Sequence, residues 1–196
     1  NDKRRRSCQT VMDLIIERLA AAIAPVLCHM AEDIWQNIPY PTGTESVFLS
    51  GWPTVPDEWR DDSLQAPMQE LRELRAAVNK VLEECRSKRE LGASLEAAVR
   101  LEARTPALQD ALHWLQSKGD QEVDGLRDWL LVSQLQIGGE PWAELLASDD
   151  NELAVIEVAL SRGEKCERCW HYESDIGQHS DHPSLCGRCV SVLERR

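Results

Sequence analysis

Four of the seven cysteines in this 196-residue chain form two closely spaced pairs. Cys166 and Cys169 make the first pair, Cys186 and Cys189 make the second, and two residues separate the members of each. This spacing lets a tight turn direct both sulfurs of a pair at one metal ion, and two such pairs are typical of a zinc site. Four thiolates fill a tetrahedral shell and leave no position for a catalytic water. The pattern predicts one structural Zn²⁺, and thiolate ligation alone leaves iron open as the alternative.

Three histidines lie in or beside the segment that joins the two cysteine pairs, namely His171, His179 and His182. Either one of them replaces a cysteine as a ligand, or all three are polar loop residues; four available cysteines favour the second interpretation. The other cysteines are expected to be small, partly buried apolar residues, because an odd count without a recognisable secretory signal argues against disulfides. They are Cys8, Cys28 and Cys85.

The chain carries a formal net charge of −12, which excludes a polybasic mode of nucleic-acid binding for the chain as a whole. Residues 161–196 hold equal numbers of basic and acidic residues, so the excess negative charge belongs to residues 1–160. The segment that contains the paired cysteines is therefore neutral before a metal is bound.

Three basic residues and a tryptophan adjoin the paired cysteines. Lys165, Arg168 and Arg188 either offset the negative charge of the thiolates or contact phosphates. Trp170 directly follows Cys169, and it either covers the metal site or offers a face on which an unpaired base stacks.

Helical periodicity dominates the first part of the chain. Residues 10–38 show helical spacing of apolar side chains, and Pro25 predicts two helical pieces joined near 24–26. This strip is too apolar to stand alone, so we expect it to pack against other helices. Residues 39–62 hold four of the nine prolines and predict an extended connector, which Trp52 and Trp59 are expected to clamp to the core.

Residues 63–90 predict the clearest helix, with Ser63 as its N-cap. Its apolar face holds Leu71, Leu74, Val78, Val81, Leu82 and Cys85. The following sequence predicts three strands and two short helices. The strands are expected at 94–103, 130–137 and 153–161, and the helices at 106–117 and 123–130.

These elements predict a mainly α fold with a small α+β unit. We expect the end of a helical bundle and its connector in residues 1–60, an α/β junction in 61–161, and a zinc module with four cysteine ligands in 162–196. Two carboxylate pairs, Asp61-Asp62 and Asp149-Asp150, are expected in polar turns or helix caps.

The sequence contains neither a glycine-rich nucleotide-binding pattern nor a nucleophile with a partner base, so the chain by itself is predicted to be non-catalytic. No apolar run approaches the roughly 20 residues of a membrane span. We expect a protein that acts away from membranes, in the cytoplasm or in an organelle of bacterial ancestry.

The segments G-E-K-C-E-R-C-W-H-Y at 163–172 and L-C-G-R-C-V at 185–190 closely resemble the zinc module of bacterial-type isoleucyl-tRNA synthetases. Residues 23–35 resemble the end of the helical anticodon-binding domain of class I synthetases, and 46–53 resemble the connector that follows it. Residues 86–97 resemble the junction that leads to the C-terminal part. The family's H-I-G-H and K-M-S-K-S signatures have no counterpart here, so we expect the chain to be about the last fifth of such an enzyme.

The resemblance implies that the full protein is an isoleucine–tRNA ligase, which joins isoleucine to tRNA-Ile using ATP and Mg²⁺ in catalytic and editing domains outside this chain. It implies that this part docks the anticodon stem-loop and that the protein is a monomer. By motif, Cys166, Cys169, Cys186 and Cys189 hold zinc. The candidates for tRNA contact are Arg168, Trp170, Lys165, Arg188, Arg86 and Lys88, with Arg72, Arg75 and Lys80 as weaker ones. A solvated helix face stays open as the alternative for the basic residues of 63–90.

Two other functions use similar cysteine spacing. One is a zinc-finger DNA-repair glycosylase, which the acidic body of this chain and the missing N-terminal Pro-Glu of that family disfavour. The other is a free-standing zinc-finger module that binds nucleic acid or acts as a protein adapter. An apolar adapter contact would be much less sensitive to salt than contacts with RNA phosphates.

Overall fold

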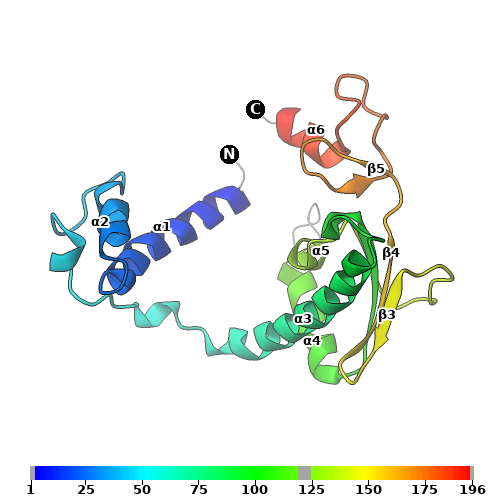
Figure 1. Cartoon of the computed structure of the whole chain (residues 1–196), viewed down its shortest axis with the longest axis horizontal. Coiled ribbons are helices and arrows are strands. Elements are labelled where there is room, and N and C mark those ends of the chain that lie inside the picture. Colours follow the sequence, from blue (N-terminus) through cyan, green and yellow to red (C-terminus); the bar gives the residue numbers. More distant parts are fainter. Residues whose placement is uncertain (1–2, 119–124, 195–196) are drawn as a thin grey trace. The chain divides into compact units, whose positions relative to one another are not determined.

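The computed structural model describes residues 3–118 and 125–194, which divide into two compact units (Figure 1). The N-terminal unit comprises residues 1–61 and the C-terminal unit comprises residues 62–196. The further separation of residues 162–196 as a domain of their own stays a prediction.

Two helices form the N-terminal unit, α1 (Lys3–Ile23) and α2 (Cys28–Gln36). The break between them includes Pro25, which confirms the predicted division of the apolar strip. Its small core combines the end of α1 with α2 and contains Ala20, Ala21, Ala24, Ala31, Trp35 and Val47. The rest of the strip has no such packing within the described residues, where Met12 and Ile15 are 64% and 51% exposed. Cys8 and Cys28 are exposed too, so their predicted burial is wrong.

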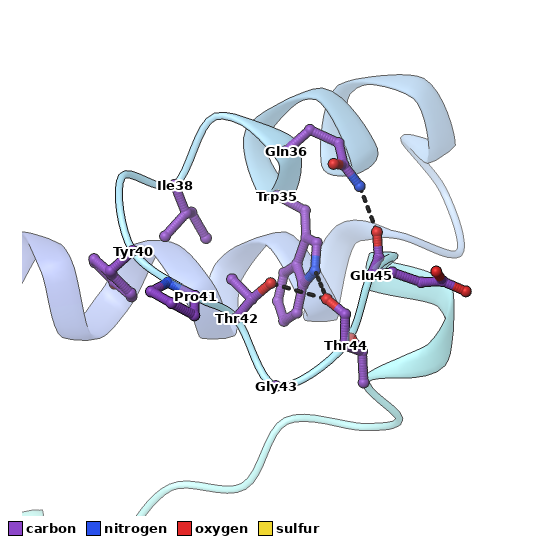
Figure 2. Close-up of a pocket in the computed structure, with 9 residues that line it drawn as sticks. All are labelled: Trp35, Gln36, Ile38, Tyr40, Pro41, Thr42, Gly43, Thr44 and Glu45. Atoms are coloured by element: carbon purple, nitrogen blue, oxygen red, sulfur yellow. Dashed lines mark hydrogen bonds between the residues drawn. The ribbon is translucent and has the colours of Figure 1, made fainter.

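The loop after α2 is fastened to that helix by hydrogen bonds. The Trp35 indole Nε1 donates to the Thr44 carbonyl at 3.0 Å, and the Gln36 amide donates to the Glu45 carbonyl at 2.6 Å (Figure 2). The Glu32 carboxylate accepts from the Ser46 hydroxyl and the Val47 backbone at 2.9 and 3.0 Å. The pocket of about 380 Å³ in Figure 2 is therefore bordered by groups that already hold the loop in place.

The connector contains two short 3₁₀ turns, η1 (Val47–Leu49) and η2 (Asp57–Trp59). Trp59 fastens it to α1, since the Arg18 guanidinium lies 4.5 Å from the Trp59 ring centroid and also donates to the Thr54 carbonyl. Trp52 is 74% exposed, so its predicted role as a clamp is wrong.

The C-terminal unit begins with η3 (Asp62–Leu64) and the long helix α3 (Gln65–Ser87). All six residues of the predicted apolar face are buried. The predicted N-cap is wrong, because Leu64 occupies the N-cap position and no side chain caps it. Two further helices pack against the same core, α4 (Pro106–Lys118) and α5 (Gly125–Leu130). Residues 123 and 124 of the second predicted helix lie outside the described residues.

A four-stranded mixed sheet lies against these helices in the order β2-β1-β4-β3. Its strands are β1 (Ala97–Ala103), β2 (Gln134–Ile137), β3 (Ala147–Asp150) and β4 (Ala154–Leu160). β2 runs parallel to β1, whereas β4 runs antiparallel to both β1 and β3. Three strands were predicted, although the first starts after a 3₁₀ turn, η4 (Ser94–Glu96).

The unpredicted strand, β3, contains Asp149 and Asp150, so their placement in a polar turn is wrong. β4 supplies the backbone partners of this edge strand, which lets it form without an apolar pattern of its own. Asp150 also pairs with Arg104 at the same end of the sheet.

The two faces of the sheet differ in chemistry. Val99, Leu101 and Ile156 belong to the apolar core with the helices. Arg100 is 1% exposed, and its guanidinium pairs with Glu102 and Glu157 at 2.9 and 3.3 Å and donates to loop carbonyls beyond β2. A buried cation is tolerated here because both charge and hydrogen bonds are matched.

The final segment forms a short hairpin and a helix, β5 (Glu164–Lys165), β6 (Tyr172–Glu173) and α6 (Gly187–Glu194). These elements were not predicted individually. The predicted class, mainly α with a small α+β unit and a C-terminal four-cysteine cluster, is confirmed. None of the described helices combines the length and apolar character that crossing a membrane requires.

Candidate metal centre and nucleic-acid interface

The structure brings the four predicted cysteines together. Their sulfurs all lie within 4.8 Å of one another, and those of Cys169 and Cys186 are 3.7 Å apart. Three of the four side chains are buried, and Cys169 is partly exposed. The first pair lies in the turn between β5 and β6, and the second spans the start of α6. A sulfur-only donor set of this kind fits a tetrahedral Zn²⁺.

Backbone hydrogen bonds shape the first cysteine turn. The Cys166 amide donates to the His171 carbonyl, and the Trp170 amide donates to the Cys166 carbonyl, both at 2.9 Å. The Cys186 amide donates to the Cys166 sulfur at 3.4 Å, which links the two pairs. The turn therefore directs backbone donors toward the Cys166 thiolate.

These backbone donors affect the pKa of the Cys166 thiol. Burial raises the pKa of the Cys166 thiol, but backbone N–H groups of Cys169, Cys186 and Arg168 lower it to about 6. For Cys186 and Cys189 burial prevails and raises the pKa. One thiolate is thus stabilised by the fold itself, whereas a bound cation would compensate the charge of the others.

Gly187 is closely approached by the Asp175 carboxylate in the second turn. Its amide donates to the Asp175 carboxylate at 2.7 Å, and an added Cβ would lie 2.9 Å from the same oxygen. Burial raises the pKa of Asp175, but the Gly187 amide and His179 outweigh it and leave the pKa below its ordinary value. The His179 Nε2 lies 3.2 Å from Asp175, so this histidine supports the loop.

Among the described residues, the group able to hold a metal contains the four cysteines and no histidine. His171 lies in the loop between β5 and β6, as the favoured interpretation expects, but it is buried at 7% exposed. Burial lowers its pKa, and the charges of Arg127 and Arg188 lower it further. His182 is partly exposed.

The basic residues beside the cluster have identifiable partners. The Arg188 guanidinium lies beside Cys169 and 3.9 Å from the Asp128 carboxylate, and the exposed Arg168 side chain interacts with Cys189. Both contacts suit the offsetting of thiolate charge.

The Lys165 ammonium lies 5.3 Å from the ring centroid of Trp170, whose side chain is 60% exposed. Trp170 also has a φ of +67°, a backbone region that side-chain-bearing residues avoid. Most of its ring surface is therefore available to a partner.

The basic residues of α3 form a separate group. Arg86 pairs with Glu83 at 3.0 Å and Lys88 with Glu84 at 3.2 Å, both on the helix surface. The Arg75 guanidinium lies 5.2 Å from the Trp129 ring centroid, while Arg72 and Lys80 are exposed. Surface ion pairs of this kind are weak and can exchange for a phosphate.

The structure also shows a polar junction that the sequence did not indicate. The Ser133 hydroxyl donates to the Leu95 carbonyl and accepts from the Tyr172 amide at 2.8 Å. The Arg127 guanidinium reaches both the Ser133 carbonyl and the Glu173 carboxylate at 3.1 Å. The hairpin that carries the first cysteine pair is thereby joined to the sheet. The one sequence signal was a serine within the apolar run at 130–137.

Comparison with known proteins gives two family matches. The family described as the anticodon-binding domain of tRNA ligases matches residues 1–101. The family described as the zinc finger found in FPG and IleRS matches residues 163–192, a range that includes all four clustered cysteines.

Individual relatives agree with these matches. The isoleucine–tRNA ligase of Synechococcus sp. (strain CC9311) is 94% identical over 196 residues, which is 100% of this chain and 20% of that protein. The ligase of Prochlorococcus marinus (strain MIT 9313) is 72% identical over 196 residues, with the same coverage. That of Parasynechococcus marenigrum (strain WH8102) is 72% identical over 195 residues.

The chain thus spans about one-fifth of the length of these ligases. Because the first family match extends over more than half of the residues, the chain belongs to the family of tRNA-ligase anticodon-binding domains.

Proposed function

We propose that this chain is the C-terminal tRNA-binding part of an isoleucine–tRNA ligase. The full protein attaches isoleucine to tRNA-Ile with ATP and Mg²⁺, in catalytic and editing domains outside this chain, and acts as a monomer in the cytoplasm. The observation that carries the proposal is the joint match to an anticodon-binding domain and to the zinc finger found in FPG and IleRS, together with 94% identity to an isoleucine–tRNA ligase. The anticodon stem-loop is the part of tRNA-Ile that this region would dock.

Four cysteines hold the metal in this proposal. Cys166, Cys169, Cys186 and Cys189 bind one Zn²⁺ as thiolates, and the ion supplies a structural cross-link between the β5–β6 turn and α6. The soft, sulfur-only donor set also accepts iron, so metal analysis decides between them. The β5–β6 hairpin that carries the first cysteine pair also carries Arg168, Lys165 and Trp170, which are all exposed.

The exposed aromatic ring is the main candidate for base contact. A positive φ costs an ordinary residue about 1 kcal/mol, and such strain is retained mainly where function requires the side chain. A glycine at position 170 would avoid this cost but would offer no ring. An exposed tryptophan ring can stack on a base, and this role would account for a side chain that the fold does not bury.

The basic residues are proposed as phosphate contacts. Arg168, Lys165 and Arg188 surround the cluster, while Arg86 and Lys88 lie at the C-terminal end of α3. The remainder of the chain is acidic, so we expect the isolated chain to bind RNA weakly and domains outside it to supply additional affinity.

The test is binding of an isoleucine tRNA transcript to the zinc-loaded chain at increasing salt concentrations. The affinity should fall linearly on logarithmic axes, because each phosphate contact releases counterions. Duplex DNA of the same charge is the matched competitor. A chain that prefers the duplex, or whose binding is insensitive to salt, would favour the glycosylase-like or adapter alternatives.

A further inference from the structure

Three non-glycine residues among those described have positive φ, namely Arg89 at 61°, Leu131 at 57° and Trp170 at 67°. Side-chain-bearing residues avoid this region because Cβ approaches the backbone too closely. All three are exposed, and Leu131 and Trp170 retain 51% and 60% of their accessible surface. None of the three is therefore held in place by burial in the core.

Arg89 and Leu131 occupy the position where a helix end favours glycine. The Arg89 amide donates to the Arg86 carbonyl at 2.9 Å and the Glu90 amide to the Cys85 carbonyl at 3.0 Å. This is the hydrogen-bond pattern of a Schellman motif, whose left-handed residue is usually glycine.

The end of α5 repeats the pattern less tightly. The Leu131 amide donates to the Asp128 carbonyl and the Val132 amide to the Arg127 carbonyl, both at 3.3 Å. The turns themselves would form at least as well with glycine, so they do not explain the two side chains.

All three strained residues lie at one end of the sheet. Arg89 belongs to the loop before β1 and Leu131 lies just before β2, which runs parallel to β1. β4 runs antiparallel to β1 and terminates at the same end of the sheet, where the chain continues into the turn that carries Trp170 (Figure 1). Leu131 and Trp170 each lie two residues from the hydrogen bond that joins Ser133 to Tyr172.

Both ends of the sheet carry charges of both signs. The strained end has Arg86 and Lys88, which pair with Glu83 and Glu84, and the opposite end has the Asp149-Asp150 strand with its Arg104 partner. The three strained side chains are therefore what indicates a ligand, because a guanidinium, an aliphatic side chain and an indole match the phosphate, the ribose and the base of an RNA strand.

We propose that Arg89 and Leu131 extend the RNA-binding face around Trp170, with Arg89 contacting a phosphate and Leu131 packing against a nucleotide. This inference rests on the proposed function, because the occupant is the tRNA. It explains why residues with side chains stand where glycine would remove strain.

The test replaces each strained residue by glycine in the zinc-loaded chain and measures both tRNA binding and the denaturation midpoint. Arg89→Gly and Leu131→Gly should keep or raise the midpoint while weakening binding by about three- to tenfold. Arg89→Gly should also reduce the salt slope by about 1. Asparagine tolerates positive φ and adds less conformational freedom to the chain than glycine does. If a glycine variant destabilises its turn, Arg89→Asn and Leu131→Asn test the loss of the side chain instead.

Arg104→Gln removes a charge at the opposite end of the sheet and serves as the control, with unchanged binding expected. If Trp170→Gly weakens binding but the Arg89 and Leu131 variants do not, the inference is wrong and the proposed function stands. If the parent chain shows no salt-dependent tRNA binding, the proposed function itself is wrong.

Discussion

The helix–sheet core and the cysteine cluster of the C-terminal unit are stabilised in different ways. The core buries apolar side chains from α3, α4, α5 and the sheet, including Leu71, Leu82, Leu108 and Ile156. The hydrophobic cluster around the metal site has cysteines as its buried members, with Ile176 and Leu185 packed beside them. The first region can fold on hydrophobic burial, whereas the second has too little apolar surface and depends on its metal.

The largest effect should follow loss of a ligand. Cys166→Ser should release the metal and unfold residues 163–194, because binding of a structural zinc supplies about 10–16 kcal/mol in small zinc domains. The helix–sheet core should persist, as judged by far-UV circular dichroism. Metal content and the near-UV signal of Trp170 report the loss.

Cys28→Ser is the matched control, since Cys28 is exposed and lies outside the cluster. It should leave metal content unchanged. Retention of the metal by Cys166→Ser would show that the site is not formed by four cysteines.

A cavity should lower the unfolding free energy of the helix–sheet core, whereas removal of the metal should leave it unchanged. Leu82→Ala removes a fully buried side chain of α3 and should cost about 2–5 kcal/mol of unfolding free energy, measured by urea denaturation. Zinc content should stay at the parent value. Leu160 is 56% exposed, so Leu160→Ala should change stability by less than about 0.5 kcal/mol.

Trp170→Gly should separate function from stability at the cluster. The change removes an exposed ring and a strained φ, so the denaturation midpoint should hold or rise. Binding to an isoleucine tRNA should weaken by about 1–3 kcal/mol if the ring stacks on a base. Trp52→Ala, which removes a ring exposed in the N-terminal unit, should bind as the parent does. Unchanged binding by the Trp170 variant with intact metal would reduce this residue to a structural part of the turn.

The smallest effect is expected on α3. Lys88→Gln removes an exposed ammonium that pairs with Glu84 at 3.2 Å. If Lys88 contacts a phosphate, the slope of affinity against salt should fall by about 1, with little change in folding. An unchanged slope would support the solvated helix face as the role of this residue.

The sequence predicts features that depend on local spacing better than features that depend on contacts between distant segments. Local spacing encodes the apolar face of α3, the break at Pro25 and the two cysteine pairs, so each was predicted from the sequence. Contacts between distant segments decide the rest. β3 forms because β4 pairs with it, and the polar sequence of β3 does not by itself indicate that it pairs with β4.

The environment of His171 and Arg100 also depends on distant segments. His171 is buried near Arg127 and Arg188, which belong to different elements, and Arg100 is neutralised by carboxylates and by carbonyls beyond β2. Neither is apparent from residue type, since histidine and arginine are usually exposed. The strained residues escaped prediction as well, because positive φ is visible only in the folded backbone.

Hydrogen exchange of the zinc-loaded chain, with and without an isoleucine tRNA, would locate the RNA-binding face. We expect tRNA to protect the amides of residues 87–95, 130–133 and 163–173, at the end of the sheet that bears the cysteine cluster. The amides of β3 and the loop after β1 should exchange as before. Protection confined to the N-terminal unit, with the cysteine cluster unaffected, would show that the cluster and its end of the sheet do not bind tRNA.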